Sequence, residues 1–319
     1  MGSSASSGLP TAHSDRSRRP AVAVIPTSGD SQSSQRTIVG MRIATWCVDS
    51  INPRLKYLCH WLDRRRPDLV ALQKTFARSD RFPQEALQQA GYESAFYARD
   101  GEFNNGWGVA VLSRKTLPKP RILQEGLPGQ EDRGARFLTV RVGGLEFSSV
   151  YAPYAAPKTN GLDGAIRRKI AWMKRLREHV EERCTRPGAC VLAGDFNVVS
   201  DGPPQDRIVN WTERERDELN ALLDLGFVDL YRRRHADGRT GCNYEFNIRK
   251  PVSTRLHRIL GTTAVASQIH EAWVDLEYRN AIAELEGSLW AQSAPVIVDL
   301  ASKAWQLTER AAERCRDGA

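Results

Sequence analysis

The sequence predicts an α/β fold, a four-layered α/β sandwich in which two packed mixed β-sheets are flanked by helices. Short apolar runs of strand length alternate with longer segments whose apolar residues recur every three or four positions. The short runs are bounded by Gly, Pro, Asn and Asp, which are typical of strand ends. Such alternation favours sheets that are covered by helices on their outer faces.

Strands are expected where a short apolar run lacks helical spacing. Residues 68–73 follow Pro67 and are almost continuously apolar, as in a strand buried on both faces. Gly143-Gly144 separates two further runs and predicts a hairpin turn. The predicted strands are 42–46, 68–73, 107–113, 137–142, 145–151, 190–193, 255–260 and 295–300.

Helices are expected where apolar residues recur at helical spacing. In the longest, 163–184, Ile166, Ile170 and Met173 lie on one face. Thr212-Glu213-Arg214-Glu215 has the form of a capping box and predicts a helix start, while Gly226 marks its end. The predicted helices are 52–65, 82–90, 163–184, 212–225 and a charged peripheral segment at 302–316.

One folded domain is expected between two less regular ends. Residues 1–40 are rich in Ser, Pro and Gly and have almost no aromatic residue, which predicts disorder. Residues 41–300 carry the alternating strands and helices, and residues 301–319 form a helical tail. Met41 directly precedes the first predicted strand and is a candidate alternative translation start.

Composition excludes several classes of protein. No run of about eighteen apolar residues occurs, so neither a membrane-spanning helix nor a membrane partner is expected. The 6 cysteines form no CxxC pair, which predicts reduced thiols in a cytoplasmic protein. The net charge of +8 and pI of ≈ 9.3 favour nucleic acid as a partner, although such charge also serves solubility alone.

An ordered set of motifs covering about residues 41–300 resembles the exonuclease III / AP endonuclease family of Mg²⁺-dependent phosphodiesterases, with many substitutions. The set is MRIATW at 41–46, RPDLVALQ at 66–73, GWGVA at 106–110, YAP at 151–153, GDFNV at 194–198, TERER at 212–216, LGFVDLYR at 225–232 and APVIVDL at 294–300. The chain is identified as a degenerate member of that family. The resemblance implies the family's four-layered sandwich, in agreement with the pattern above.

The resemblance also implies a catalytic site with three retained positions. In this family carboxylates hold one Mg²⁺ at the scissile phosphate, an Asp activates water, and a His–Asp pair stabilises the transition state. Tyr151 matches the phosphate-contacting Tyr, Asp195 the water-activating Asp, and Asn197 the Asn two residues later. From the residues alone, Tyr151 also fits a core aromatic, and Asp195 with Asn197 fits a turn that bonds its own backbone.

Five other family positions are substituted. Lys74 replaces a metal-binding Glu, Cys47 an Asn, and His257 a ligand Asp, while Gln292 and Ser293 replace the Asp and His of a Ser-Asp-His-Ala-Pro motif. Glu to Lys changes the charge by two units, and the two losses of Asp change it by one each, which makes about four. We expect no cofactor, because Mg²⁺ requires oxygen ligands and should bind weakly or not at all here.

These substitutions favour a catalytically impaired pseudo-nuclease that still binds nucleic acid, DNA rather than RNA. The candidates for nucleic-acid contact are Lys74, Arg136, Arg167, Arg168, Trp211 and Arg249. Phosphate contacts would make binding weaken with salt. The run Arg167-Arg168-Lys169 is a further candidate for phosphate contact, although a solvated helix face is the favoured interpretation of such a run.

Two alternatives stay open. One is a regulatory or scaffold protein that acts through a protein partner, for which the sequence locates no interface. The other is a residual or rewired metal-dependent phosphodiesterase of the exodeoxyribonuclease III / AP endonuclease type. In that case Cys47, Asp195 and His257 would converge and suit Zn²⁺ better than Mg²⁺. Otherwise Cys47 is a small buried apolar residue and His257 an ordinary strand residue.

Overall fold

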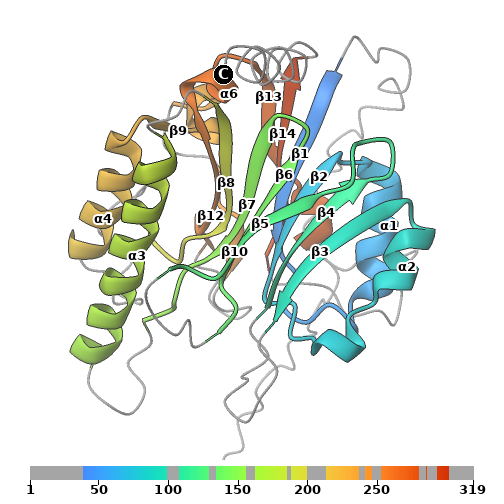
Figure 1. Ribbon diagram of the computed structural model, residues 1–319, viewed down its shortest axis with the longest axis horizontal. Helices are drawn as coiled ribbons and strands as arrows, with labels where there is room; N and C mark the ends of the chain where they lie inside the picture. Colours follow the sequence, from blue (N-terminus) through green and yellow to red (C-terminus); the bar gives the residue numbers. More distant parts are fainter. Residues whose placement is uncertain are drawn as a thin grey trace, which may run out of the picture. The chain divides into compact units, whose positions relative to one another are not determined.

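Two six-stranded sheets pack face to face in the computed structural model (Figure 1). Helices α1 (Leu55–Arg65) and α2 (Gln84–Gln89) cover one sheet, and α3 (Leu162–Cys184) and α4 (Glu213–Asp224) cover the other. The predicted four-layered α/β sandwich is therefore confirmed. The structure describes residues 39–98, 108–128, 134–155, 162–184, 188–199, 213–236, 241–245, 253–279, 285 and 293–301.

The first sheet brings both ends of the folded domain together. Its order is β13-β14-β1-β2-β4-β3, and β1 pairs in parallel with β2 but antiparallel with β14. The bounds are β1 (Val39–Cys47), β2 (Leu69–Gln73), β3 (Tyr92–Ala98), β4 (Gly108–Arg114), β13 (Ile269–Val274) and β14 (Val296–Ala301). The first strand thus begins at Val39, inside the segment that was expected to be disordered.

The second sheet carries two of the three retained family positions, Tyr151 and Asp195. Its order is β5-β6-β7-β8-β12-β9, with β7 and β8 parallel and β12 antiparallel to β8. The bounds are β5 (Arg121–Glu125), β6 (Phe137–Val142), β7 (Leu145–Tyr151), β8 (Ala189–Asp195), β9 (Phe227–Asp229) and β12 (His257–Thr262).

Short elements complete the described part of the chain. They are β10 (Tyr244–Glu245), β11 (Ser253–Thr254), α5 (Leu230–Arg234), α6 (Thr263–Ala266), and the 3₁₀ helices η1 (Ser79–Arg81) and η2 (Leu276–Arg279). None of the described helices is long and apolar enough to cross a bilayer.

Alternation along the central strands builds the separate core layers. Ile43 and Ala71 belong to the core between the sheets, whereas Ala44 and Leu72 belong to the layer under α1, where they join Trp61. Successive strand residues point to opposite faces, so strands with apolar residues at every position are buried on both. This explains why the central strands lack a polar alternation.

The predicted elements mostly differ from the structure by a few residues at their ends. The hairpin 137–142 and 145–151 is confirmed at both strands, with Gly143 in the left-handed region at φ 57°. The predicted helix 52–65 begins only at Leu55. The predicted helical tail 302–316 lies outside the described residues, as does Thr212 of the capping box. The strands β3, β5, β9, β10, β11 and β13 and the helices α5 and α6 were not predicted.

A buried ion pair ties α3 to α4 beneath the second sheet. Lys169 Nζ lies 2.5 Å from Glu215 Oε1, also donates to the carbonyl of Asn197, and both charged side chains are fully buried. The interpretation of Lys169 as part of a phosphate-binding run with Arg167 and Arg168 is wrong, because its ammonium faces the protein interior. Glu215 likewise binds Lys169, a role the capping-box interpretation did not include.

We expect Lys169→Met to lower the free energy of unfolding by about 3–5 kcal/mol, because it leaves the Glu215 carboxylate buried without its counter-charge. Urea denaturation measures the change. Lys174→Met is the matched control on the same helix, since Lys174 is exposed and its effect should stay within about 0.5 kcal/mol.

The double variant Lys169→Met/Glu215→Leu should recover much of the loss, because it removes both charges. A double variant no more stable than Lys169→Met would contradict this account of the pair.

Candidate functional site

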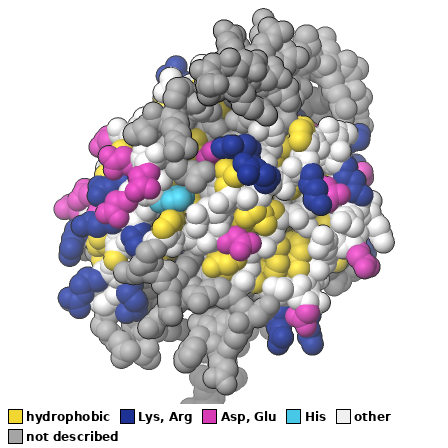
Figure 2. All heavy atoms as spheres, viewed as in Figure 1, with side chains coloured by type: hydrophobic (Ala, Val, Ile, Leu, Met, Phe, Trp, Pro, Cys, Tyr) yellow, Lys and Arg dark blue, Asp and Glu magenta, His cyan; other side chains and the backbone are white. Residues whose placement is uncertain are grey.

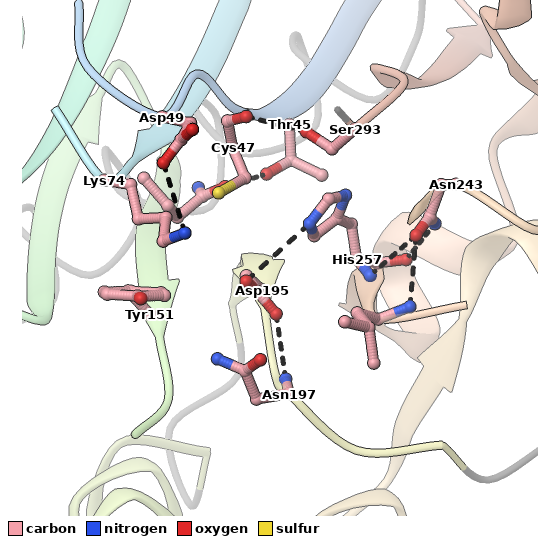
Figure 3. Close-up of polar contacts among 12 residues, drawn as sticks. Thr45, Cys47, Asp49, Lys74, Tyr151, Asp195, Asn197, Asn243, His257 and Ser293 are labelled. Atoms are coloured by element: carbon pink, nitrogen blue, oxygen red, sulfur yellow. Dashed lines mark hydrogen bonds and ion pairs between the residues drawn. The ribbon is translucent and has the colours of Figure 1, made fainter. Parts of the chain in front are cut away.

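Strand register places three motif residues side by side. Tyr151 ends β7 and pairs with Asp195 at the end of β8, and Asp195 pairs in turn with His257 at the start of β12. Cys47 ends β1 in the opposite sheet, beside Gln73 at the end of β2. The site is therefore built where strand ends of both sheets meet, and its side chains point toward one another (Figure 3).

Gly194 allows β8 to lie close to β7 immediately before Asp195. A Cβ at this position would lie 1.9 Å from the carbonyl oxygen of Val150, well inside van der Waals contact. Glycine is the residue that permits so close a backbone approach. The Gly of the GDFN motif thus has a packing role next to the site.

Asp195 is a buried carboxylate held in its ionised form. Its Oδ1 accepts a hydrogen bond from the backbone amide of Asn197 at 2.9 Å, and its Oδ2 lies 3.7 Å from His257 Nε2. Burial alone would raise the pKa of Asp195. The interaction with His257, with smaller effects from the Asn197 amide and Lys74, holds that pKa below its ordinary value.

Asn197 is fixed by its amide and by its backbone. Its side-chain nitrogen donates to the carbonyl of Ala152 at 2.8 Å, and its φ of 51° is left-handed, a region that Asn tolerates. The Lys169 ammonium binds its carbonyl from below. The Asp195–Asn197 turn therefore bonds its own backbone and also points two motif side chains into the site.

Tyr151 is buried and stacked against a cation. The Arg136 guanidinium lies 4.8 Å from the centre of the Tyr151 ring and also contacts the Tyr151 carbonyl. Burial raises the pKa of the Tyr151 phenol well above its ordinary value, and Arg136 opposes part of the rise. Tyr151 therefore stays protonated and is able to donate a hydrogen bond.

Lys74 brings an ammonium group to the same strand ends. Its Nζ lies 3.2 Å from Asp49 Oδ1. Burial raises the pKa of the Cys47 thiol well above its ordinary value, and the Lys74 charge opposes part of that rise. The same charge contributes to the lowered pKa of Asp195. Asp49 is a partner that sequence reasoning missed, because nothing in the chain spacing pairs positions 49 and 74.

The two loops that carry Lys74 and Asp49 have a strained backbone. Asp49, Ser50, Lys74 and Phe76 all have positive φ, which is uncommon for residues other than glycine. Backbone hydrogen bonds from Ser50 to Lys74 and from Ile51 to Thr75 join the loops. Such local strain concentrates at functional sites and requires support from the surrounding structure.

Cys47 and His257 are both anchored through their backbones. The Ser293 hydroxyl donates to the Cys47 carbonyl at 2.6 Å, while Asn243 Oδ1 accepts from the His257 amide at 3.1 Å and Asn243 Nδ2 donates to its carbonyl at 2.9 Å. Ser293 thus uses its hydroxyl to join the end of β1 to the segment that precedes β14. Asn243 was not predicted, and its neighbouring sequence gives no signal for this role.

The described site has a mixed set of candidate metal ligands. One ligand atom each from Cys47, Asp195 and His257 lie within 4.8 Å of one another, and all three residues are buried. Mg²⁺ requires oxygen ligands in near-octahedral geometry. A thiol, an imidazole and the neighbouring Lys74 ammonium do not meet that requirement, so this set does not fit Mg²⁺.

The predicted nucleic-acid contacts fall into three groups. Lys74 and Arg136 lie at the site, as described above. Arg167 and Arg168 are exposed on α3, over which cationic and acidic side chains are intermixed (Figure 2). Trp211 and Arg249 lie outside the described residues, as does Gln292. The structure thus places two of the six at the strand ends.

Tyr154 is an exposed aromatic residue beside Lys74 that sequence reasoning missed. Its side chain is 42% exposed, and the Lys74 ammonium opposes the rise in its pKa that burial causes. The YAP motif was recognised for Tyr151 alone, although the second tyrosine, Tyr154, follows only three residues later.

Comparison with known proteins decides the family. A model of the Endonuclease/Exonuclease/phosphatase family matches residues 48–280. The chain belongs to this family. Recombination repair protein 1 of Drosophila melanogaster is 28% identical over 206 residues, which are 62% of this chain but only 29% of that protein. The DNA repair nuclease APEX1 of Danio rerio is 26% identical over 237 residues, 70% of this chain and 74% of that protein.

Solved structures agree with this assignment. The 3′-5′ exonuclease NExo of Neisseria meningitidis has a TM-score of 0.70 and 29% identity, covering 82% of this chain and 100% of that chain. An AP endonuclease from Archaeoglobus fulgidus, at 24% identity and a TM-score of 0.69, shares the fold over 82% of this chain and 99% of that chain. The resemblance to the exonuclease III / AP endonuclease family is thereby confirmed.

We expect Asn197→Ala to be more destabilising than Asn197→Gly by about 1 kcal/mol. Both variants lose the hydrogen bond to Ala152, but alanine alone must also adopt the left-handed φ of 51°. Paired urea denaturation curves measure the difference. Equal stabilities, or a less stable glycine variant, would show that backbone strain is not what selects Asn here.

Proposed function

We propose that this chain is a nucleic-acid-binding pseudo-nuclease of the exonuclease III / AP endonuclease family. It would bind DNA at the strand-end site and lack ordinary Mg²⁺-dependent phosphodiester cleavage. The observation that carries the proposal is the Lys74 ammonium, which lies among Asp49, Asp195 and Cys47 where the family has a metal-binding carboxylate.

The position of Lys74 supports phosphate binding. Its side chain is 23% exposed, so the ammonium is partly accessible to a ligand. An ammonium group attracts a phosphate as a point charge, and its flexible stem allows it to leave Asp49 for a DNA oxygen. The ion pair with Asp49 would keep the charge in place while no ligand is bound.

Neighbouring groups support the same ligand. Arg136 adds a second cation beside Tyr151, and the exposed ring of Tyr154 offers a surface on which a base is able to stack. The relatives are DNA-acting proteins by name, and the Neisseria 3′ phosphatase NExo, 28% identical to this chain, has been solved bound to a product DNA hairpin. These likenesses favour DNA over RNA.

The proposed loss of cleavage rests on two features of the described site: its metal ligands and the residue at the position of the family's catalytic His. A ligand set with a thiol and an imidazole supports weak Mg²⁺ binding, because Mg²⁺ prefers oxygen ligands. By the motif resemblance, Ser293 takes the position of the family's catalytic His. A hydroxyl that bonds the Cys47 carbonyl does not supply an imidazolium to the transition state. Loss of one such electrostatic donor typically lowers turnover by about 10²- to 10³-fold.

We expect Lys74→Ala to weaken DNA binding to a similar degree for all sequences and to reduce the slope of log K against log salt by about 1, because one phosphate contact is lost. Fluorescence anisotropy titrations over a salt series measure both effects. Lys115→Ala is the matched control, since Lys115 is exposed and follows β4, which runs antiparallel to β2 and therefore ends at the opposite end of the strands from Lys74. Equal slopes for the parent and Lys74→Ala would remove Lys74 from the DNA-binding site.

We expect the parent protein to leave abasic-site DNA uncut with Mg²⁺ or Mn²⁺. The variant Lys74→Glu/His257→Asp/Gln292→Asp/Ser293→His restores four of the five substituted family residues and should cleave, by about 10²-fold or more above the parent. Adding Asp195→Ala to that variant is the control and should abolish the gain. Cleavage by the parent that Asp195→Ala removes would overturn the proposed loss of activity.

A further inference from the structure

Two of the substituted family positions now carry donors softer than oxygen. A thiol at Cys47 and an imidazole at His257 lie beside the Asp195 carboxylate, and each comes from a different strand, β1, β12 and β8. Thiolate, imidazole and carboxylate are the side-chain donors that bind Zn²⁺. We propose that Cys47, Asp195 and His257 form a Zn²⁺ site with three protein ligands.

The distances match a tetrahedral centre. Bonds of about 2.0–2.3 Å to a tetrahedral metal place neighbouring ligand atoms about 3.3–3.8 Å apart. His257 Nε2 and Asp195 Oδ2 are already 3.7 Å apart, and all three ligand atoms lie within 4.8 Å of one another. A contraction of about 1.5 Å at most brings the Cys47 sulfur into place. Figure 3 shows Cys47, Asp195 and His257 around the same space.

The charges balance when the metal binds. Binding of Zn²⁺ displaces the proton of the Cys47 thiol, which leaves to solvent. The resulting thiolate and the Asp195 carboxylate supply two negative charges, which neutralise one Zn²⁺. The nearby Lys74 ammonium would oppose a cation, but Asp49 lies 3.2 Å from its Nζ and offsets that charge. All three ligand residues are buried, and the bound Zn²⁺ needs no counter-ion beyond the two ligand charges.

The supporting residues hold the three ligands in a fixed arrangement. Ser293 bonds the Cys47 carbonyl, the Asn197 amide bonds Asp195, and Asn243 bonds both backbone groups of His257. A metal site gains affinity when its ligands are held in position before the metal arrives. Three protein ligands leave the fourth tetrahedral position for water or for an oxygen of a bound phosphate.

The test uses the full chain and the metals alone. Purified protein dialysed against Zn²⁺ should retain one equivalent by elemental analysis. Co²⁺ in its place should show tetrahedral absorption bands and a thiolate-to-cobalt charge-transfer band. Cys47→Ser should lose that charge-transfer band, whereas the matched control Cys59→Ser, on half-buried Cys59 of α1, should retain it. His257→Asn should weaken Zn²⁺ binding by about 100-fold.

Zn²⁺ content and Co²⁺ spectra are measured on the protein without DNA. The test is therefore independent of the proposed DNA-binding function. Lys74→Ala should tighten Zn²⁺ binding by about tenfold, because it removes a neighbouring positive charge, whereas the same change should weaken DNA binding. Far-UV circular dichroism and urea unfolding of each variant establish that it is folded. A folded parent that retains no Zn²⁺, or a cobalt spectrum unchanged in Cys47→Ser, would overturn the proposal.

Discussion

The hydrogen-bond register between β7, β8 and β12 is the constraint on which the site depends. It sets Tyr151 beside Asp195 and Asp195 beside His257, and side chains at paired positions on adjacent strands are close neighbours. A slip of β8 by one residue would turn the Asp195 side chain to the other face of the sheet, away from Tyr151 and His257. Gly194 makes this register sterically feasible, because any side chain there would collide with the backbone of Val150.

The second determinant is the packing between the two sheets, which brings Cys47 and Lys74 to the same place. Buried polar groups continue across this packing. Gln73 Nε2 donates to the Ser149 hydroxyl at 3.1 Å, and that hydroxyl donates to the Leu72 carbonyl at 2.9 Å. A buried polar network of this kind favours one relative placement of the sheets over others, because a shift would leave its members unsatisfied. Cys47 and Lys74 are thus positioned by contacts between the sheets in which neither residue takes part.

Much of the fold was predictable because its central strands and long helices have clear periodicity. The hairpin around Gly143 was located to the residue, and the apolar stripe of α3 identified the longest helix. Edge strands such as β13 were missed because exposed residues like His270 and Glu271 interrupt their apolar pattern. Lys169 was misinterpreted through its charged neighbours, although it lies one position from Ile170 and three from Ile166, on the buried helical face.

The candidate site was predictable only through the resemblance. Chain spacing alone does not bring positions 47, 195 and 257 together, because they lie on strands whose order in the sheets differs from their order in the chain. Asp49 and Asn243 were missed for a related reason: each acts through a tertiary contact that leaves no local pattern. Loop residues of this type are visible only when the fold is in place.

The antiparallel pairing of β1 with β14 has a consequence for how the chain reaches its native state. Among the residues that the structure describes, the first strand along the chain is flanked on one side by the last, with Val39 opposite Ala301. During synthesis, one edge of β1 therefore stays unsatisfied until nearly the whole domain has left the ribosome. Contacts of such large sequence separation form slowly, and an open strand edge is prone to pair with other chains. Truncation before β14 should thus yield aggregation rather than a smaller folded protein.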